Sequence, residues 1–441
     1  MSTARWDLPE NWSWVVLPDV GRIVGGGTPP AGDMTNFSDG GGIPWITPAD
    51  LTGYASTYIG RGRRDLTAKG FAACGAAKMP AGTVLFSSRA PIGYCVVAAN
   101  EISTNQGFKS VVPVDGIVPE FLRHYLISSR EYVASFASGT TFPEVSGARM
   151  AEVAVPVAPT EEQRRIVAKL DALTACTARA RIDLDRIPAL AARYKQAVLG
   201  KVFGELDYEP EKLIDLVDPA RGIPYGIVQT GVPVPFGVPT VRCGDVRQFS
   251  VEKEGLKIVA QDIADAYART QLRGGEVLLA IRGSVGNSAV VGPEFAGCNI
   301  SREVALIPVG KRLRPRFAMF FLGSPEAQAY LKRHVKGVAQ TGINLEDVRS
   351  LTLPVPELAV QDAVVERIDR ALVEIDRLAA EAAAARRLLN RLDQAVLAKA
   401  FRGELVPQDP TDEPASILLD RIRAERASAP MATRGRRKAV A

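Results

Sequence analysis

The chain has 441 residues, of which 46% are hydrophobic and 23% charged, and its formal net charge is +5. This composition is typical of a soluble globular protein that is long enough for two or more domains. Five scattered cysteines with no C-x-x-C pair argue against a disulfide framework or a zinc cluster. No apolar run approaches the roughly 18 residues of a membrane span, and no signal peptide is recognisable, so we expect a cytoplasmic protein without membrane association.

Two globular blocks and two long helices follow one another along the chain. Residues 1–157 mix short β-type runs with a helix-like stretch, which predicts an α+β block. Residues 158–206 predict a long helix, in which Thr160 and Gln163 fit a capping box and Pro188 should cause a kink or break. Residues 207–356 predict a second globular block and residues 357–406 a second long helix. In the tail, 407–441, we expect a short helix at 415–427 and a disordered end.

The second half of the chain repeats the first. Residues 44–51 return as 239–246, 82–89 as 275–282, 155–157 as 353–355 and 196–199 as 394–397. The offsets run from 193 (275 − 82) to 198 (394 − 196), whereas solenoid repeats have periods of about 20–50 residues. The chain therefore contains two copies of one domain-plus-helix unit, which suits a target with two halves.

Both predicted helices carry a heptad pattern of apolar or small residues. In the first helix these are Ile166, Leu170, Leu173, Thr177, Ala180, Leu184, Ile187, Ala191, Tyr194 and Val198. In the second they are Val364, Ile368, Ala371, Ile375, Leu378, Ala382, Ala385, Leu389, Leu392 and Val396. Sustained steps of four and three predict a coiled-coil seam, so we expect the helices to pair as an antiparallel coiled coil. Each would be about 60 Å long.

No catalytic motif is recognisable in the sequence. The phosphate-binding loop G-x-x-x-x-G-K-S/T is missing, no string matches the Asn/Asp-Pro-Pro-Tyr/Phe motif of adenine methyltransferases, and the carboxylates are scattered. These observations favour a binding subunit over an enzyme. Two alternatives remain: a self-contained DNA methyltransferase or nuclease with diverged motifs, and a coiled-coil scaffold with no role on DNA.

The chain resembles the specificity subunit of type I restriction-modification systems, because it has several motifs of that family in the same order. They are Gly26–Pro29, Trp45–Asp50, Pro80–Arg89, Ser103–Phe108, Pro156–Ile166, Phe203–Leu206 and Phe401–Leu405. The resemblance covers about residues 10–406. The second long helix departs from the family pattern, because Leu358-Ala359-Val360-Gln361 replaces the usual Glu-Gln start.

This resemblance implies the following organisation and partners. Residues 1–157 and 207–356 would each be a target recognition domain that reads one half of a bipartite, asymmetric double-stranded DNA site. The helical segments 158–206 and 357–406 would set the spacer and dock two methyltransferase subunits that methylate adenine N6 with S-adenosylmethionine. A translocase-endonuclease subunit would join for cleavage. The chain itself would hold no cofactor and no metal and would be non-catalytic.

Basic and polar residues in loops are the candidates for DNA contact, because phosphate neutralisation dominates affinity and polar side chains read base edges. Arg89 and Arg282 follow matched β-type runs and are the pair retained in both copies. The full set in the first block is Arg61, Arg63, Arg64, Ser87, Ser88, Arg89, Asn105, Gln106, Thr140 and Thr141. In the second block it is Arg269, Arg273, Arg282, Lys332, Arg333, Lys336 and Gln340.

Overall fold

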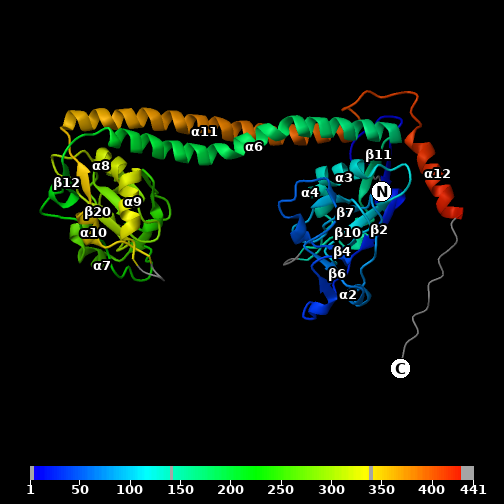
Figure 1. The fold of residues 1–441 in the computed structure, drawn as a ribbon, viewed down its shortest axis with the longest axis horizontal. Helices are drawn as coiled ribbons and strands as arrows, with labels where there is room; N and C mark the ends of the chain where they lie inside the picture. The colour runs from blue at the N-terminus through cyan, green and yellow to red at the C-terminus, as the bar shows by residue number, and fades with distance from the viewer. Residues whose placement is uncertain (1–3, 140–142, 337–340, 429–441) are drawn as a thin grey trace. The chain divides into compact units, whose positions relative to one another are not determined.

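The computed structural model describes residues 4–139, 143–336 and 341–428. Its internal contacts divide the chain into two units (Figure 1). Unit 1 consists of Met1–Arg181 with Arg386–Ala441, and unit 2 of Ile182–Ala385. The division falls inside both long helices, so each unit contains one globular block and one end of each helix. Thr140, Thr141 and Gln340, three of the predicted DNA contacts, lie outside the described residues.

Unit 1 is built on two larger sheets and one two-stranded sheet. The larger has the order β2 (Gly21–Gly25), β10 (Lys109–Pro113), β7 (Val84–Phe86), β8 (Cys95–Ala98) and β5 (Tyr58–Ile59). The smaller has the order β3 (Phe37–Ser38), β6 (Arg64–Leu66), β4 (Ile43–Ile46) and β9 (Ser103–Thr104), and β1 (Ser13–Val16) pairs with β11 (Ala154–Val157). The short helices are α1 (Leu17–Val20), α2 (Ala68–Ala72), α3 (Pro119–Ser128), α4 (Arg130–Ala134) and α5 (Gly147–Met150). Phe86, Phe121 and Tyr125 fill the core between β7 and α3.

Unit 2 repeats this plan. Its sheets are β18 (Ser288–Val290), β17 (Val277–Ala280) and β20 (Val304–Ile307); β16 (Lys257–Val259), β13 (Val238–Val241) and β19 (Asn299–Ile300); β14 (Val246–Arg247) with β15 (Ser250–Val251); and β12 (Pro210–Lys212) with β21 (Thr352–Pro354). Its short helices are α7 (Gln261–Asp265), α8 (Pro315–Leu322), α9 (Pro325–His334) and α10 (Leu345–Arg349). The repeated motif keeps its register, because β13 runs parallel to β19 just as β4 runs parallel to β9.

The two long helices are α6 (Thr160–Gly204) and α11 (Leu358–Phe401) (Figure 1). Helix α6 is continuous through Pro188, which excludes the predicted break, while the predicted kink stays a prediction. Within each unit the helical segments are antiparallel neighbours. In unit 1 Arg181 forms an ion pair with Asp393, and in unit 2 Lys195 pairs with Asp376 and Arg367 with Glu205.

The seam between the helices departs from the predicted heptads at four positions. Ile166, Leu170, Val364 and Ile368 are buried as predicted, but Ala180, Tyr194, Leu378 and Leu392 are exposed, the last three at 63%, 50% and 48%. A straight helix drifts by about 20° per heptad from a strict repeat of 3.5. Because of this drift, the neighbouring Arg181, Lys195 and Asp393 turn toward the opposite helix and form the ion pairs there.

A buried glutamine, not a capping box, fixes the start of each long helix. In unit 1 the Gln163 amide accepts a hydrogen bond from the Val118 N–H at 2.8 Å and donates to the Ala158 carbonyl at 2.9 Å. The Thr160 hydroxyl donates to the Gly116 carbonyl, so the predicted capping role of Thr160 is wrong. In unit 2 Gln361 repeats the pattern, accepting from the Arg314 N–H at 2.8 Å and donating to the Pro356 carbonyl at 2.8 Å. Both glutamine side chains are fully buried. Their hydrogen bonds to Val118 and Arg314 attach each helix to its own globular block.

The chain after α11 stays in unit 1 and ends its described part in α12 (Ala415–Ser428). Ala415, Leu418, Leu419 and Ile422 are buried in the core of unit 1, at the helical spacing of one face. Leu418 lies against Gly116, where a Cβ would come within 2.4 Å of Leu418 Cδ1. The predicted helix at 415–427 is confirmed, while residues 429–441 lie outside the description. Among the described helices, none is both long and apolar enough to cross a membrane.

Candidate nucleic-acid interface

The matched arginines Arg89 and Arg282 occupy equivalent places in the two units. Each follows a central strand, β7 or β17, and each forms a backbone bridge to the same part of a neighbouring loop. Arg89 bridges to Glu144, and Arg282 bridges to Gly342. The loop positions share the helical offset of 198 (342 − 144). The fold therefore brings both arginines beside repeat-related loops, as the sequence repeat predicted.

The electrostatic surroundings of the two arginines differ. In unit 1, Glu144 accepts hydrogen bonds from Arg89 Nε at 2.8 Å and from Lys109 Nζ at 3.1 Å. Burial alone would raise the pKa of Glu144, but the hydrogen bonds from Arg89 and Lys109 hold it below its usual value. In unit 2 the acid is replaced by Gly342, and Arg282 forms no ion pair with any residue that the structure describes. Arg282 is thus the more available of the two cations for an anionic ligand.

Two of the predicted base-reading residues are inaccessible. Ser87 and Ser88 are both fully buried at the end of β7. The Ser87 hydroxyl donates to the Pro91 carbonyl at 2.8 Å, and the Ser88 hydroxyl donates to the Gly107 carbonyl at 3.2 Å. The prediction that they contact DNA is corrected, because their hydroxyls are used in tying this strand end to neighbouring loops.

The remaining polar candidates of unit 1 have mixed surroundings. Asn105 accepts the Gly107 N–H at 2.9 Å and so stabilises its own turn, while Gln106 is exposed and accepts from Thr28. Arg61 pairs with Asp65 at 3.2 Å, and the Arg64 guanidinium lies 4.6 Å from the centre of the Phe37 ring. The Arg63 side chain is exposed and forms no ion pair with a described residue.

The basic candidates of unit 2 are exposed, except for the half-buried Arg282. Arg269 donates to the Arg221 carbonyl at 2.9 Å, which fixes its guanidinium at the edge of the block. Arg273, Lys332 and Arg333 project from a loop and from the last turn of α9. Lys336 lies 3.8 Å from Asp347.

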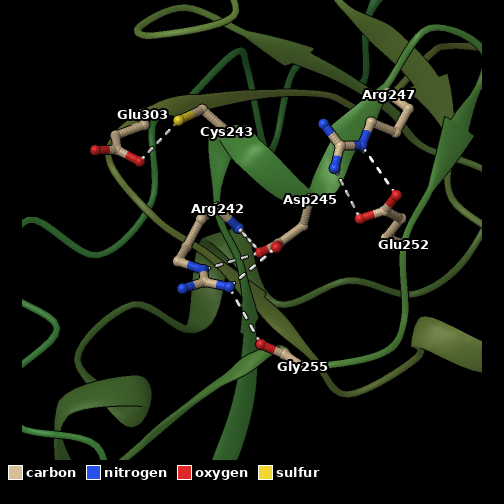
Figure 2. Close-up of polar contacts among 7 residues, drawn as sticks. All are labelled: Arg242, Cys243, Asp245, Arg247, Glu252, Gly255 and Glu303. Atoms are coloured by element: carbon tan, nitrogen blue, oxygen red, sulfur yellow. Dashed lines mark hydrogen bonds and ion pairs between the residues drawn. The ribbon is translucent and has the colours of Figure 1, made fainter. Parts of the chain in front are cut away.

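The repeated motif itself forms a turn held by an aspartate. Figure 2 shows Asp245 accepting from the Arg242 N–H at 2.8 Å and from the Arg242 guanidinium at 3.0 Å. In unit 1 Asp50 accepts from the Thr47 N–H at 2.8 Å. Arg247 is likewise paired, with Glu252 at 3.0 Å (Figure 2). The motif is therefore structural in both units, and its Arg242, like the following Arg247, is already paired with a carboxylate.

Cys243, in the same turn, is not an activated nucleophile. Its thiol donates to a Glu303 carboxylate oxygen at 3.1 Å (Figure 2). Burial, and then this neighbouring carboxylate, raise the pKa of the Cys243 thiol, whereas a reactive cysteine needs a depressed pKa. Among the described residues no cluster of three or more histidine, cysteine, aspartate or glutamate side chains could hold a metal ion.

Two adjoining basic grooves on unit 2 were not predicted from the sequence. One, of about 480 Å³, is lined in part by Arg221, Arg269 and Arg349, and the other, of about 310 Å³, by Arg282 and Arg302. They share Tyr225 and Leu345, and neither lining contains a carboxylate. Tyr225 is 49% exposed between them. Arg221 is buried and ion-paired with Glu276 at 2.7 Å, and Arg349 lies 3.6 Å from Glu346. The remaining guanidinium groups, Arg269, Arg282 and Arg302, lie beside an exposed aromatic ring and are suited to a sugar-phosphate backbone. Only Arg269 and Arg282 of this group had been predicted.

Comparisons with known proteins identify this arrangement. The family model described as "Type I restriction modification DNA specificity domain" matches residues 9–184 and again 236–379. The chain belongs to this family. The double match is also independent evidence for the internal repeat, because each copy falls on one globular block with the start of a long helix.

Curated relatives agree with this assignment. The chain is 27% identical over 462 residues to the type I restriction enzyme EcoBI specificity subunit of Escherichia coli, covering 96% of this chain and 94% of the relative. It is 42% identical over 168 residues to the MjaIX specificity subunit of Methanocaldococcus jannaschii, where the match spans 37% of this chain and 38% of the relative. These relatives are specificity subunits, so the prediction of a non-catalytic DNA-specificity chain is confirmed, and nothing favours a self-contained enzyme.

Solved structures confirm the fold class. One chain, from a study titled "Structural basis underlying complex assembly and conformational transition of the type I R-M system", aligns with a TM-score of 0.72 at 23% identity, covering 91% of this chain and all of that chain. The HsdS subunit from Thermoanaerobacter tengcongensis aligns with a TM-score of 0.56 at 23% identity, covering 92% of this chain and all of that chain. The predicted α+β architecture with two repeated blocks and two long helices is therefore confirmed.

Proposed function

We propose that this chain selects the DNA sequence for a type I restriction-modification complex, with each globular block reading one half of a bipartite, asymmetric site. The observation that carries this proposal is the equivalent placement of Arg89 and Arg282. Each arginine follows the end of a repeat-related strand, and each lies beside the repeat-related loop of its own block. The two blocks differ at these positions, since Glu144 faces Arg89 and Gly342 faces Arg282. Two half-sites of different sequence require two recognition sites with equivalent backbone structure and different side chains.

The partners are two methyltransferase subunits, which use S-adenosylmethionine to methylate adenine N6, and a translocase-endonuclease for cleavage. Two matched apolar patches support two copies of one partner. In unit 2 Leu190 and Tyr194 of α6 are 50% and 63% exposed, and in unit 1 Leu388 and Leu392 of α11 are 61% and 48% exposed. The pairs are related by the offset of 198 (388 − 190 and 392 − 194), and residues four apart share a helix face. Exposed apolar patches mark interaction surfaces.

The proposed function is tested by mapping DNA methylation. Single-molecule sequencing of genomic DNA should reveal a new N6-methyladenine motif, in two parts with a fixed gap, in cells that express this chain with its methyltransferase partner. The Arg282→Gln variant should lose methylation by weakening one half-site only, since a bidentate arginine–base or arginine–phosphate contact is worth about 1–3 kcal/mol. A new motif without a gap, or methylation that persists when the chain is deleted, would contradict the proposal.

A further inference from the structure

A third basic groove lies on unit 1, where the C-terminal helix meets the first globular block. It has a volume of about 690 Å³ and lies between β2, α5 and the end of α12. Its lining includes three cations, Arg22, Lys109 and Arg426, and no carboxylate. Arg426 comes from α12, more than 270 residues away from the rest of the lining (426 − 151 = 275).

This groove is the counterpart of the 480 Å³ groove on unit 2. The short helix α5 and the residue directly after it line the groove through Gly147 and Ala151, and in unit 2 helix α10 lines the groove through Leu345 and Arg349. Both pairs are related by the offset of 198 (345 − 147 and 349 − 151). Unit 2 therefore supplies a guanidinium from its own short helix, whereas unit 1 has an alanine at that position. The missing cation of unit 1 is supplied by α12.

The packing of α12 explains how Arg426 reaches the groove. Leu418, Leu419 and Ile422 are buried in unit 1, and Arg426 follows Ile422 by four residues, on the same face of the helix. The apolar face thus continues into a basic position at the edge of the core. The family model matches only up to residue 379, so this helix is an addition to the matched repeat.

The charge of this groove is only partly compensated. Lys109 is hydrogen-bonded to Glu144 at 3.1 Å. Arg22 and Arg426 are exposed, and neither forms a hydrogen bond or ion pair through its side chain with a residue that the structure describes. Two guanidinium groups in one groove without a carboxylate repel each other, and an anion placed between them relieves that repulsion.

We propose that Arg22 and Arg426 bind a phosphodiester of the DNA backbone next to the half-site of unit 1, so that α12 completes the phosphate-binding surface of this unit. The inference rests on the proposed function and extends it to a segment outside the family match. Phosphate contacts of this kind fix the register of a protein on the duplex without reading its sequence. The contact therefore contributes affinity and position, and leaves the choice of bases to the loops.

Salt-dependent binding of the full-length chain, in complex with its methyltransferase partner, tests this proposal. The probes are a duplex with the mapped bipartite sequence and a duplex with both halves scrambled. The Arg426→Gln and Arg22→Gln variants should each reduce the slope of log affinity against log salt by about 0.9 and weaken binding roughly 5- to 20-fold at low salt. Arg426→Lys should keep most of the slope. Arg423→Gln is the matched control, because Arg423 lies on the same helix but pairs with Asp420 at 2.9 Å.

Duplexes with single methylphosphonate substitutions locate the contact without a protein variant. With the wild-type complex, one neutralised phosphate flanking the half-site of unit 1 should weaken binding, and the same substitution should have no further effect on Arg426→Gln. An unchanged slope in Arg426→Gln and Arg22→Gln, or equal losses in Arg423→Gln, would overturn the phosphate site while leaving the proposed function intact. If the wild-type complex does not prefer the bipartite duplex to the scrambled one, the proposed function itself fails.

Discussion

Replacing Gln163 with methionine should destabilise unit 1 by about 2–4 kcal/mol. Methionine fills a similar volume but cannot accept from the Val118 N–H or donate to the Ala158 carbonyl, which now bond to Gln163 at 2.8 and 2.9 Å. The site is fully buried, and each unsatisfied buried backbone group costs about 1–3 kcal/mol. The Gly116 carbonyl keeps its hydrogen bond from the Thr160 hydroxyl, so two groups are left without partners.

Tryptophan fluorescence during urea unfolding measures this loss in unit 1 alone. All four tryptophans, Trp6, Trp12, Trp14 and Trp45, belong to that unit. The Gln361→Met variant, which removes the repeat-related hydrogen bonds in unit 2, should shift the circular-dichroism transition more than the fluorescence transition. Gln394→Met, at an exposed position of α11, is the surface control. A fluorescence midpoint for Gln163→Met equal to that of this control would refute the reasoning.

Three further predictions concern α12, a buried carboxylate and the helix patches. Leu418→Ala should lower the free energy of unfolding, measured in the fluorescence transition, by about 2–4 kcal/mol. The adjacent Ile417→Ala, at a position 51% exposed, should leave it almost unchanged. Equal effects would mean that α12 is not packed on unit 1. Burial raises the pKa of Glu162 above its ordinary 4.5, so its contribution to stability is full below about pH 4.5 and is lost as the pH rises. The stability of the wild type relative to Glu162→Gln should therefore fall as the pH rises above about 4.5, and a constant difference would contradict this. Mass photometry should count one bound methyltransferase copy instead of two for either of two double variants, Leu388→Asp with Leu392→Asp or Leu190→Asp with Tyr194→Asp. The control Ala383→Asp, at an exposed position of α11, should keep both copies.

The features that the sequence predicted are those encoded by local patterns or by the repeat. The long helices follow from apolar spacing over about nine turns, and the equivalence of Arg89 and Arg282 follows from the repeat offset. The burial of Ser87 and Ser88 could not be predicted in this way. Strand β7 is buried on both faces, so the alternation that normally separates inward from outward residues carries no signal there.

The basic grooves could not be predicted because they join residues that are distant in the sequence. Arg22 and Arg426 meet only because α12 packs on unit 1, and Arg349 becomes significant only beside Arg269. One signal could have suggested a difference between the grooves. The helical offset of 198 aligns Arg349 with Ala151, which marks a cation present in one copy and missing in the other. The exposed seam positions, in turn, reflect the gradual drift between the heptad period and the helical period.

The most direct test of two independent reading blocks is methylation mapping after exchange of a single block. Residues 207–356 would be replaced by the equivalent block of a related specificity subunit, and the modified motif would be sequenced in cells that contain the same methyltransferase partner. The account predicts that one half of the bipartite motif changes while the other half remains as it was. A change in both halves, or in neither, would contradict the assignment of one half-site to each block.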